Sequence, residues 1–234
     1  MKKIIYVLFM VIGIVVTSCK KDEIQIVELD SFTAVDIAAF GELEDVTNVK
    51  ATVNFVQQDT FLMDIQKSTQ DSIRWYVKKD TLYVLILNSK SPKLTIHAPY
   101  YKSIRCLNVN KIEIKDTLRQ SSLNFYSSGT ETTIMSLNVD TLNLCMDIYK
   151  KVKLFGHCDT ASIQAEFCHA FANFDASKFI VNNMQISCGT ANAHTSLNVL
   201  KHLWIIDALN SRIDYTGNPD IMQANLHYTT LRGN

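Results

Sequence analysis

The residues best suited to chemistry are cysteines and histidines gathered in one part of the chain. His157-Cys158, Cys168-His169, Cys188 and His194 lie within 38 residues. Thiolate and imidazole groups bind zinc, but zinc sites usually carry closely spaced ligands such as Cys-x-x-Cys, which is absent here. Adjacent residues of a strand also point to opposite faces, so neighbouring Cys and His side chains cannot share one metal. We therefore predict no metal site and no cofactor.

Two of these thiols, Cys168 and Cys188, are twenty residues apart. We expect them to be stacked in an apolar core, where free cysteine is common. A disulfide between them is the alternative, because neighbouring strands bring Cα atoms within the range that a disulfide spans. No third group that would orient the base of a Cys-His nucleophile pair is identifiable.

The sequence carries no motif that identifies an enzyme. Gly-x-Ser-x-Gly, His-Glu-x-x-His and a glycine-rich phosphate loop with lysine are all missing. Asp147 and Asp207 share a column at a period of twenty, but no acid lies between them in that column. We predict no catalysis, and a glycan-active β-helix enzyme, which would need clustered carboxylates, is the alternative.

Aromatic side chains offer weak candidates for ligand binding. Tyr100 and Tyr101, beside Pro99, are predicted to be exposed; simple packing is their expected role, with glycan binding as the alternative. Trp204 lies in an apolar segment and is expected in the core, and Trp75 remains open.

The N-terminus has the layout of a secretory signal. Lys2 and Lys3 precede the apolar stretch Ile4 to Val16. As a helix this stretch would be about 20 Å long, against a hydrocarbon core of about 30 Å. Val16-Thr17-Ser18-Cys19 then resembles a bacterial lipobox, in which the cysteine thiolate takes a diacylglyceryl group and starts the mature chain. We predict a signal peptide over 1–18 and a covalent lipid, with acyl chains such as palmitate, on Cys19.

Four charges, Lys20-Lys21-Asp22-Glu23, follow this cysteine. They resemble the signal that sends lipoproteins to the cell surface in one phylum of gut-associated Gram-negative bacteria. The predicted location is a lipid anchor in the outer membrane facing outward, with a periplasm-facing anchor as the alternative.

Removing residues 1–18 leaves 216 residues, enough for one domain with a sizeable core. Without Lys2 and Lys3, 21 basic residues face 23 acidic ones, a net charge of −2. The sequence also has no basic stripe that would neutralise phosphates, so nucleic acid is not an expected partner. Lipidation of Cys19 would leave five cysteines, an odd number, so at least one thiol should be free.

Short alternating apolar runs predict a mainly β chain, with a tether over 19–30 and a single domain over 31–234. Residues Ile73 to Leu87 predict a hairpin that turns at Lys78-Lys79-Asp80. The other expected strands are Phe61–Ile65, Lys93–His97, Lys111–Lys115, Lys151–Phe155 and Leu203–Ile206.

The second half of the chain suggests a repeat of about twenty residues. At this period one column holds only small residues, and SLNV occurs at both 136–139 and 196–199. The small column contains Ser136, Gly156, Ala176, Ser196 and Thr216. Twenty residues of strand suit one coil of a right-handed parallel β-helix, or β-solenoid, in which successive coils bury their apolar faces against each other.

The order of motifs resembles the head GIN domain family of adhesins over about residues 31–221. Phe32-Thr33-Ala34-Val35 matches the opening segment, Leu82-Tyr83-Val84 a strand end, and Tyr215-Thr216-Gly217-Asn218-Pro219 the closing motif. A β-segment ending in proline, matched by Leu94 to Pro99, lies between them. Ser128-Gly129 and Cys188-Gly189 keep the Ser-Gly-type turns of the repeats, whereas Ile148-Tyr149, Cys168-His169 and Ala208-Leu209 replace the glycine. The resemblance implies a β-solenoid-like fold and an adhesive role.

The sequence therefore predicts a non-catalytic envelope lipoprotein that acts as an adhesin or binding module. Expected partners are the membrane, through the lipid, and a glycan, a host-matrix protein or an envelope protein. A structural envelope protein without a ligand is a further alternative.

Overall fold

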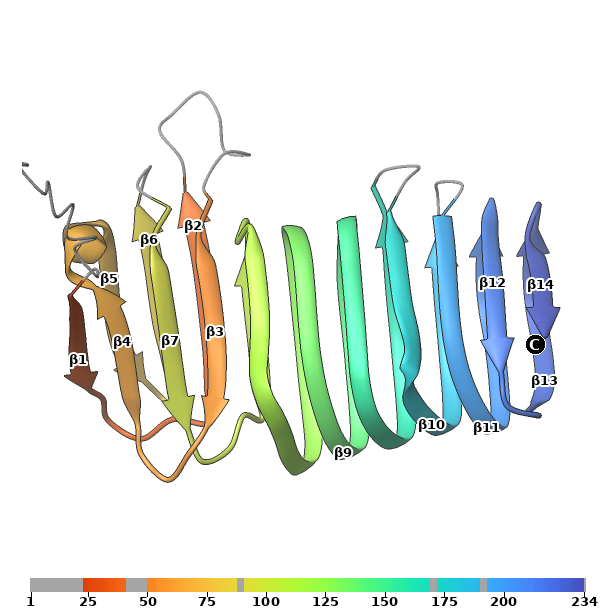
Figure 1. The fold of residues 1–234 in the computed structure, drawn as a ribbon, viewed down its shortest axis with the longest axis horizontal. Coiled ribbons are helices and arrows are strands. Elements are labelled where there is room, and N and C mark those ends of the chain that lie inside the picture. Colours follow the sequence, from red (N-terminus) through yellow and green to blue (C-terminus); the bar gives the residue numbers. More distant parts are fainter. Residues whose placement is uncertain (1–22, 41–49, 88–90, 169–171, 190–192, 234) are drawn as a thin grey trace, which may run out of the picture.

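The computed structural model describes residues 23–40, 50–87, 91–168, 172–189 and 193–233, without the side chain of residue 224. These residues form one curled sheet, so the predictions of a mainly β class and a single domain are confirmed (Figure 1). The strands are β1 Ile24–Glu28, β2 Ala34–Phe40, β3 Thr52–Gln57, β4 Leu62–Gln66, β5 Ile73–Lys78, β6 Thr81–Leu87, β7 Lys93–Ala98, β8 Ser103–Leu107, β9 Lys111–Phe167, β10 Asn173–Gly189, β11 Ala193–Leu209, β12 Ser211–Thr216, β13 Asp220–His227 and β14 Thr230–Gly233.

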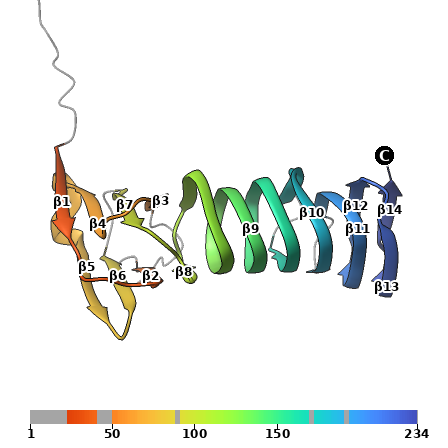
Figure 2. The same ribbon diagram turned by 90° about the horizontal axis from the view of Figure 1, so that it is seen from below.

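The sheet is folded into two facing limbs joined by bends. The first limb contains β3, β7, β12, β14 and residues 111–114, 151–153, 173–175 and 193–198. The second limb contains β2, β6, β8, β13 and residues 124–128, 160–166, 183–189 and 202–209. In Figure 1 the arrows of β3 and β7 point down and those of β2 and β6 point up, and Figure 2 shows β9 winding from one limb to the other.

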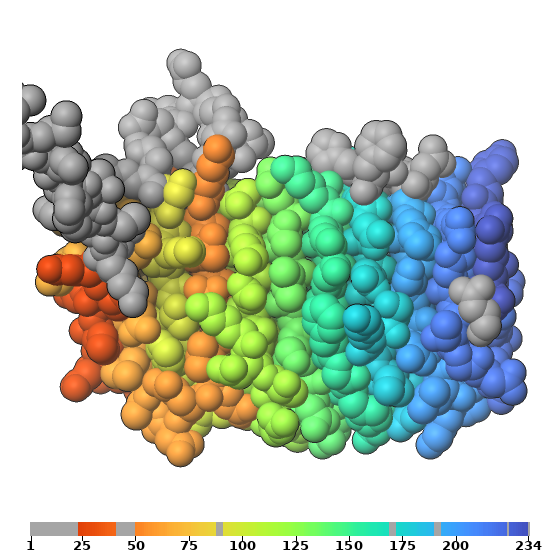
Figure 3. Space-filling view, viewed as in Figure 1, coloured from red at the N-terminus to blue at the C-terminus, as the bar shows by residue number. Residues whose placement is uncertain are grey.

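Alternating side chains explain why the limbs face each other. Along β8 the inward residues Ile104 and Cys106 are buried, while Arg105 between them is exposed. The same period-two pattern holds through most of β9, β10 and β11, and it places every second side chain between the limbs. The space between the limbs is filled by aromatic and aliphatic groups such as Phe55 and Phe174. Neighbouring passes of the chain lie against each other without a break in the space-filling view (Figure 3).

The predicted hairpin is confirmed. β5 pairs antiparallel with β6 from Ile73↔Ile86 to Lys78↔Thr81. Lys79 and Asp80, the two loop residues, both have positive φ, at 49° and 62°. Two successive positive φ angles are the signature of a type I′ turn, whose twist matches that of the flanking strands.

The N-terminal end of the sheet is built differently from the rest. β1 and β4 pair antiparallel, and a 3₁₀ helix, η2 (Lys67–Ser72), connects β4 to β5. Residues Ile24–Glu28, expected in the tether, are thus part of the sheet, since β4 offers a free edge that satisfies their backbone groups. The described part of the chain has no helix both long and apolar enough to cross a bilayer.

Successive passes of the chain pair in parallel, but their length is not constant. Ala193 pairs with Ser211, eighteen residues later, whereas Phe155 pairs with Lys178, twenty-three residues later. Bulges such as the one between Asp175 and Lys178 absorb the difference. The alignment of columns at exactly twenty residues was therefore wrong, because a bend can add residues without disturbing the pairing on the limbs.

The predicted column of small residues does not stack. Gly156 pairs with Phe179 rather than Ala176, and the hydroxyl of Ser136 bonds to that of Thr117 at 2.9 Å. Ser196 does pair with Asp175, one residue away from the expected partner.

Close approach of backbones explains two glycines at bends. Gly156 has φ +107°, and a Cβ there would lie 1.9 Å from the carbonyl oxygen of Leu137. Gly217 has φ +91°, and a Cβ there would lie 2.0 Å from the carbonyl oxygen of Val199. Of the Ser-Gly-type turns, Gly129 has a positive φ of 69°, while Gly189 has open space around its Cβ position. The segment Ala208-Leu209 turns one residue later, at Asn210, whose φ is 47°.

Candidate functional site

The outer face of the second limb carries a continuous line of side chains that we call the outward row. It crosses the sheet perpendicular to the strands, and none of its members is buried. In order along the sheet the row consists of Tyr76, Tyr83, Asp36, Arg105, Tyr126, Cys145, Gln164, Ser187, Asp207 and Asn225. Pairing in register, antiparallel between β5 and β6 and parallel beyond, creates the row, since residues opposite each other on adjacent strands share a face.

Aromatic rings and one ion pair occupy the N-terminal half of the row. Tyr76 and Tyr83 are stacked with ring centroids 4.9 Å apart. Arg105 Nη1 donates to both oxygens of the Asp36 carboxylate, each at 3.1 Å. The same guanidinium lies over the Tyr126 ring, 5.8 Å from its centroid. The positive and negative charges therefore neutralise each other, and the guanidinium holds the Tyr126 ring in place.

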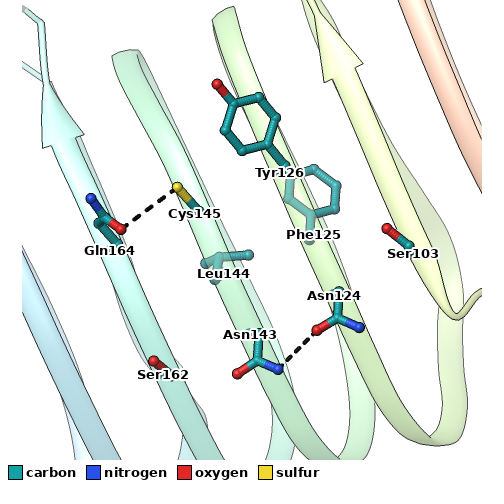
Figure 4. Close-up of a pocket in the computed structure, with 9 residues that line it drawn as sticks. All are labelled: Ser103, Asn124, Phe125, Tyr126, Asn143, Leu144, Cys145, Ser162 and Gln164. Carbon is teal, nitrogen blue, oxygen red and sulfur yellow. Dashed lines mark hydrogen bonds between the residues drawn. The ribbon is translucent and has the colours of Figure 1, made fainter.

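A shallow depression of about 290 Å³ lies beside Tyr126 on this face. Its floor includes the buried residues Phe125 and Leu144, and its rim is polar (Figure 4). Asn143 Nδ2 donates a hydrogen bond of 2.8 Å to Asn124 Oδ1. The other lining residues are Ser103, Tyr126, Cys145, Ser162 and Gln164. The site offers uncharged donors and acceptors around one aromatic ring.

The thiol in this depression is not an activated nucleophile. Burial, followed by the charges of Asp147 and Glu166, raises the pKa of Cys145. Its Sγ lies 3.9 Å from Gln164 Oε1. A thiol with a raised pKa stays protonated at neutral pH and attacks poorly.

Two carboxylates lie side by side next to the depression. Alignment of the sequence at a fixed period of twenty does not predict this pair. Cys145 faces Gln164, and the amide of Cys168 donates to the carbonyl of Ile148, so Asp147 stands opposite Glu166. Asp147 also accepts a hydrogen bond of 2.5 Å from Ser128 Oγ. Asp207, by contrast, pairs with Ser187 and Asn225.

The predicted stacking of Cys168 and Cys188 is wrong. Cys188 is buried and pairs with Ala165 and Ala208, whereas Cys168 is exposed. All five cysteines of the described residues are free thiols. Burial raises the pKa of Cys158 and that of Cys188 to about 11.

The histidines expected near these thiols are dispersed. His194, on the first limb, lies 2.7 Å from Asp214 Oδ2, and that carboxylate also meets Arg212 at 2.7 Å. The Arg212 contact, with that of His194, lowers the pKa of Asp214. His157 is 3.9 Å from Asp159. His169 lies outside the described residues, and among those described no three His, Cys, Asp or Glu side chains could hold a metal ion.

The two tyrosines proposed as ligand contacts have structural roles. The expected exposure of Tyr101 is wrong: it is fully buried, and its hydroxyl donates to the carbonyls of Val56 and Ile96 at 2.9 and 2.7 Å. Tyr100 is half-buried, with its hydroxyl 3.1 Å from Ser122 Oγ. Both lie in the bend after β7, where the chain packs on the next bend.

Of the other aromatic candidates, Trp204 lies away from its expected place. Trp204 is half-exposed rather than in the core, because its strand position points outward, and it stacks on His202 with centroids 5.6 Å apart. Trp75 is partly buried against the core. Cys19, the predicted lipidation site, lies outside the described residues. The outward row was missed because its members are far apart in sequence and only the register unites them.

Comparison with known proteins gives a consistent picture. The family model described as "Putative auto-transporter adhesin, head GIN domain" matches residues 40–219. A crystal structure of a "putative adhesin" from Bacteroides fragilis is 19% identical, with a TM-score of 0.73, and the match covers 92% of this chain and 98% of that one. We find no match among curated proteins.

Two further solved structures share the fold. A "putative adhesin" from Parabacteroides merdae has a TM-score of 0.64 at 12% identity, over 91% of this chain and 95% of that one. A "Putative lipid binding protein" from Parabacteroides distasonis has a TM-score of 0.59 at 13% identity, over 91% and 96%.

Proposed function

This chain belongs to the head GIN domain family of auto-transporter adhesins, and from that premise we propose that it is a non-catalytic binding module displayed on the cell envelope. The outward row carries this proposal. It extends over the whole second limb, from β5 to β13, and is open to solvent rather than closed into a cleft. Extended surfaces of stacked strands suit attachment to large ligands.

The proposed anchor is a lipid on Cys19. A lipobox-like sequence and the charges of 20–23 support an outer-membrane lipoprotein facing outward, with a periplasm-facing anchor as the alternative. β1 begins at Ile24, five residues after this cysteine, so the sheet would stand close to the membrane.

The fold that we propose is a right-handed parallel β-helix, or β-solenoid-like domain. Parallel pairing of β10 with both β9 and β11 supports this class. Each pass leaves its backbone groups to be paired by the next, so the stack would fold as one cooperative unit.

Adhesion is tested by comparing cells. Bacteria that express the full chain and an isogenic deletion strain are applied to immobilised host-matrix proteins, mucins and polysaccharides, and retained cells are counted. We expect the deletion strain to lose attachment to at least one surface. Equal attachment of both strains to every surface contradicts the adhesive role and favours a structural envelope protein without a ligand.

Asp147 and Glu166 favour a second candidate function. Carboxylates on adjacent strands approach the separation of about 5 Å that retaining glycosidases use. A glycan-active enzyme would release reducing ends from a polysaccharide, and Asp147→Asn would abolish the release. Reducing-end assays on the purified chain decide between this candidate and pure binding.

A further inference from the structure

We propose that the depression lined by Asn124, Tyr126, Asn143 and Gln164 binds a neutral carbohydrate chain laid along the outward row. This inference rests on the proposed function, because it names the ligand class of the binding surface. Three observations support it: the neutrality of the lining, the position of one aromatic ring and the spacing of polar side chains.

The lining is rich in hydrogen-bonding groups and carries no net charge. Side-chain amides of Asn124, Asn143 and Gln164 present both donors and acceptors, and Ser103 and Ser162 add hydroxyls. Arg105 and Asp36, the nearest charged pair in the row, neutralise each other at 3.1 Å. Asp147 and Glu166, the two carboxylates beside the depression, would repel an anionic ligand. Vicinal hydroxyls of a sugar can donate and accept at the same time, whereas a phosphate needs an unpaired cation. The chemistry therefore favours a neutral polyol.

Tyr126 supplies the apolar contact that a sugar ring requires. Its side chain is 38% exposed and borders the depression (Figure 4). Arg105 lies over the ring at 5.8 Å and restricts its motion. A pyranose has an apolar face of C–H groups that packs on a tyrosine ring, and a ring already held in place loses little entropy when it binds.

The spacing of the polar groups fits a repeating ligand. Adjacent strands lie about 4.8 Å apart, so each pass of the chain adds one polar contact at this step. Asn124 and Asn143 are one step apart, and so are Cys145 and Gln164. Consecutive sugars of a linear chain would meet equivalent groups on consecutive passes. The shallow, open form of the depression lets such a chain enter and leave at both ends.

Binding of defined glycans by the full chain, purified in detergent, tests this inference. The probes are immobilised cello-oligosaccharides, xylan, mannan, galactan and neutral mucin glycans, with heparin and polyphosphate as anionic comparisons. The variants are Tyr126→Ala, Tyr126→Phe, Asn143→Ala and, as a matched control, Tyr228→Ala. Tyr228 is an exposed tyrosine outside the row, and 89% of its surface is accessible. Circular dichroism and thermal midpoints verify that each variant is folded.

We expect the unchanged chain to bind at least one neutral glycan. Tyr126→Ala should weaken this binding about tenfold and Asn143→Ala about fivefold, whereas Tyr126→Phe and Tyr228→Ala should stay within about twofold. If the ring were merely structural, Tyr126→Ala would lower the thermal midpoint without changing the affinity of the folded protein. That result, or binding to anionic probes only, overturns the inference.

The cell-attachment assay separates the two proposals. Attachment to a matrix protein without binding to any neutral glycan refutes the carbohydrate site and leaves the adhesive role intact. If the deletion strain attaches as well as the parent strain and the purified chain binds no neutral glycan, both proposals are refuted. Glycan binding that is unchanged in Tyr126→Ala and Asn143→Ala places the ligand elsewhere and overturns the assignment of this depression.

Discussion

Substitution of Gly156 by alanine tests how closely the bends of neighbouring passes must approach. The added Cβ would lie 1.9 Å from the carbonyl oxygen of Leu137 and 3.0 Å from its carbonyl carbon. Both atoms belong to the backbone of the preceding pass, so no side chain can rotate to relieve the contact. The passes must therefore separate at this bend.

The expected cost follows from two contributions. An L-residue held at a positive φ costs about 1–2 kcal/mol. Displacing the Leu137 carbonyl also breaks one or two backbone hydrogen bonds between the passes, each contributing about 0.5–1.5 kcal/mol. We expect Gly156→Ala to lower the free energy of unfolding by about 1.5–5 kcal/mol, which would be measured mostly as a lower urea midpoint.

Gly189→Ala is the matched control. Nothing lies within 4 Å of its Cβ position, so alanine should be neutral or stabilise slightly by restricting the unfolded chain. Urea unfolding of both variants, followed by circular dichroism, gives the comparison. Unfolding free energies within about 0.5 kcal/mol of each other would refute the close-approach argument.

Four further predictions concern the core, the thiols and the anchor. Tyr101→Phe should lower the free energy of unfolding by about 1–3 kcal/mol, measured in urea, because two buried carbonyls lose a donor. Burial raises the pKa of Cys158 and of Cys188 from 9.0 to about 11, so the unfolded chain releases these thiol protons at a lower pH than the folded chain does. Stability present below about pH 9 should therefore fall as the pH rises to about 11, and unchanged urea midpoints across this range would contradict the burial. In the native protein at neutral pH, Cys168 should react with a thiol reagent before both of these buried cysteines, as mass spectrometry can measure. Cys19→Ser should move the protein from the membrane pellet to the soluble fraction, and continued sedimentation would argue against lipidation.

Much of the strand content could be predicted because it depends on local patterns. The hairpin predicted over Ile73 to Leu87 has the outer bounds of β5 and β6, and its turn at Lys79-Asp80 was located from the flanking alternation. These features involve residues within a few positions of each other, where side-chain period and turn chemistry are sufficient.

The candidate site could not be predicted in the same way. A fixed period of twenty aligns Asp147 with residue 167, but Asp147 stands opposite Glu166. In this part of β9 the facing residues are nineteen positions apart, as Cys145 and Gln164 show. A shift of one residue on a strand reverses the face of every side chain. Tyr101 shows a second limit, since one of its hydroxyl partners is the carbonyl of Val56 in β3, 45 residues away.

The amino-acid sequence alone determined that this chain is mainly β and resembles the head GIN domain family, since both follow from residue types and local order. The tertiary structure decided which residues lie side by side on the outer face. That arrangement depends on the length of every bend, and passes that vary from eighteen to twenty-three residues do not keep one exact period. Only the folded register brings Asn124, Tyr126 and Asn143 into one surface.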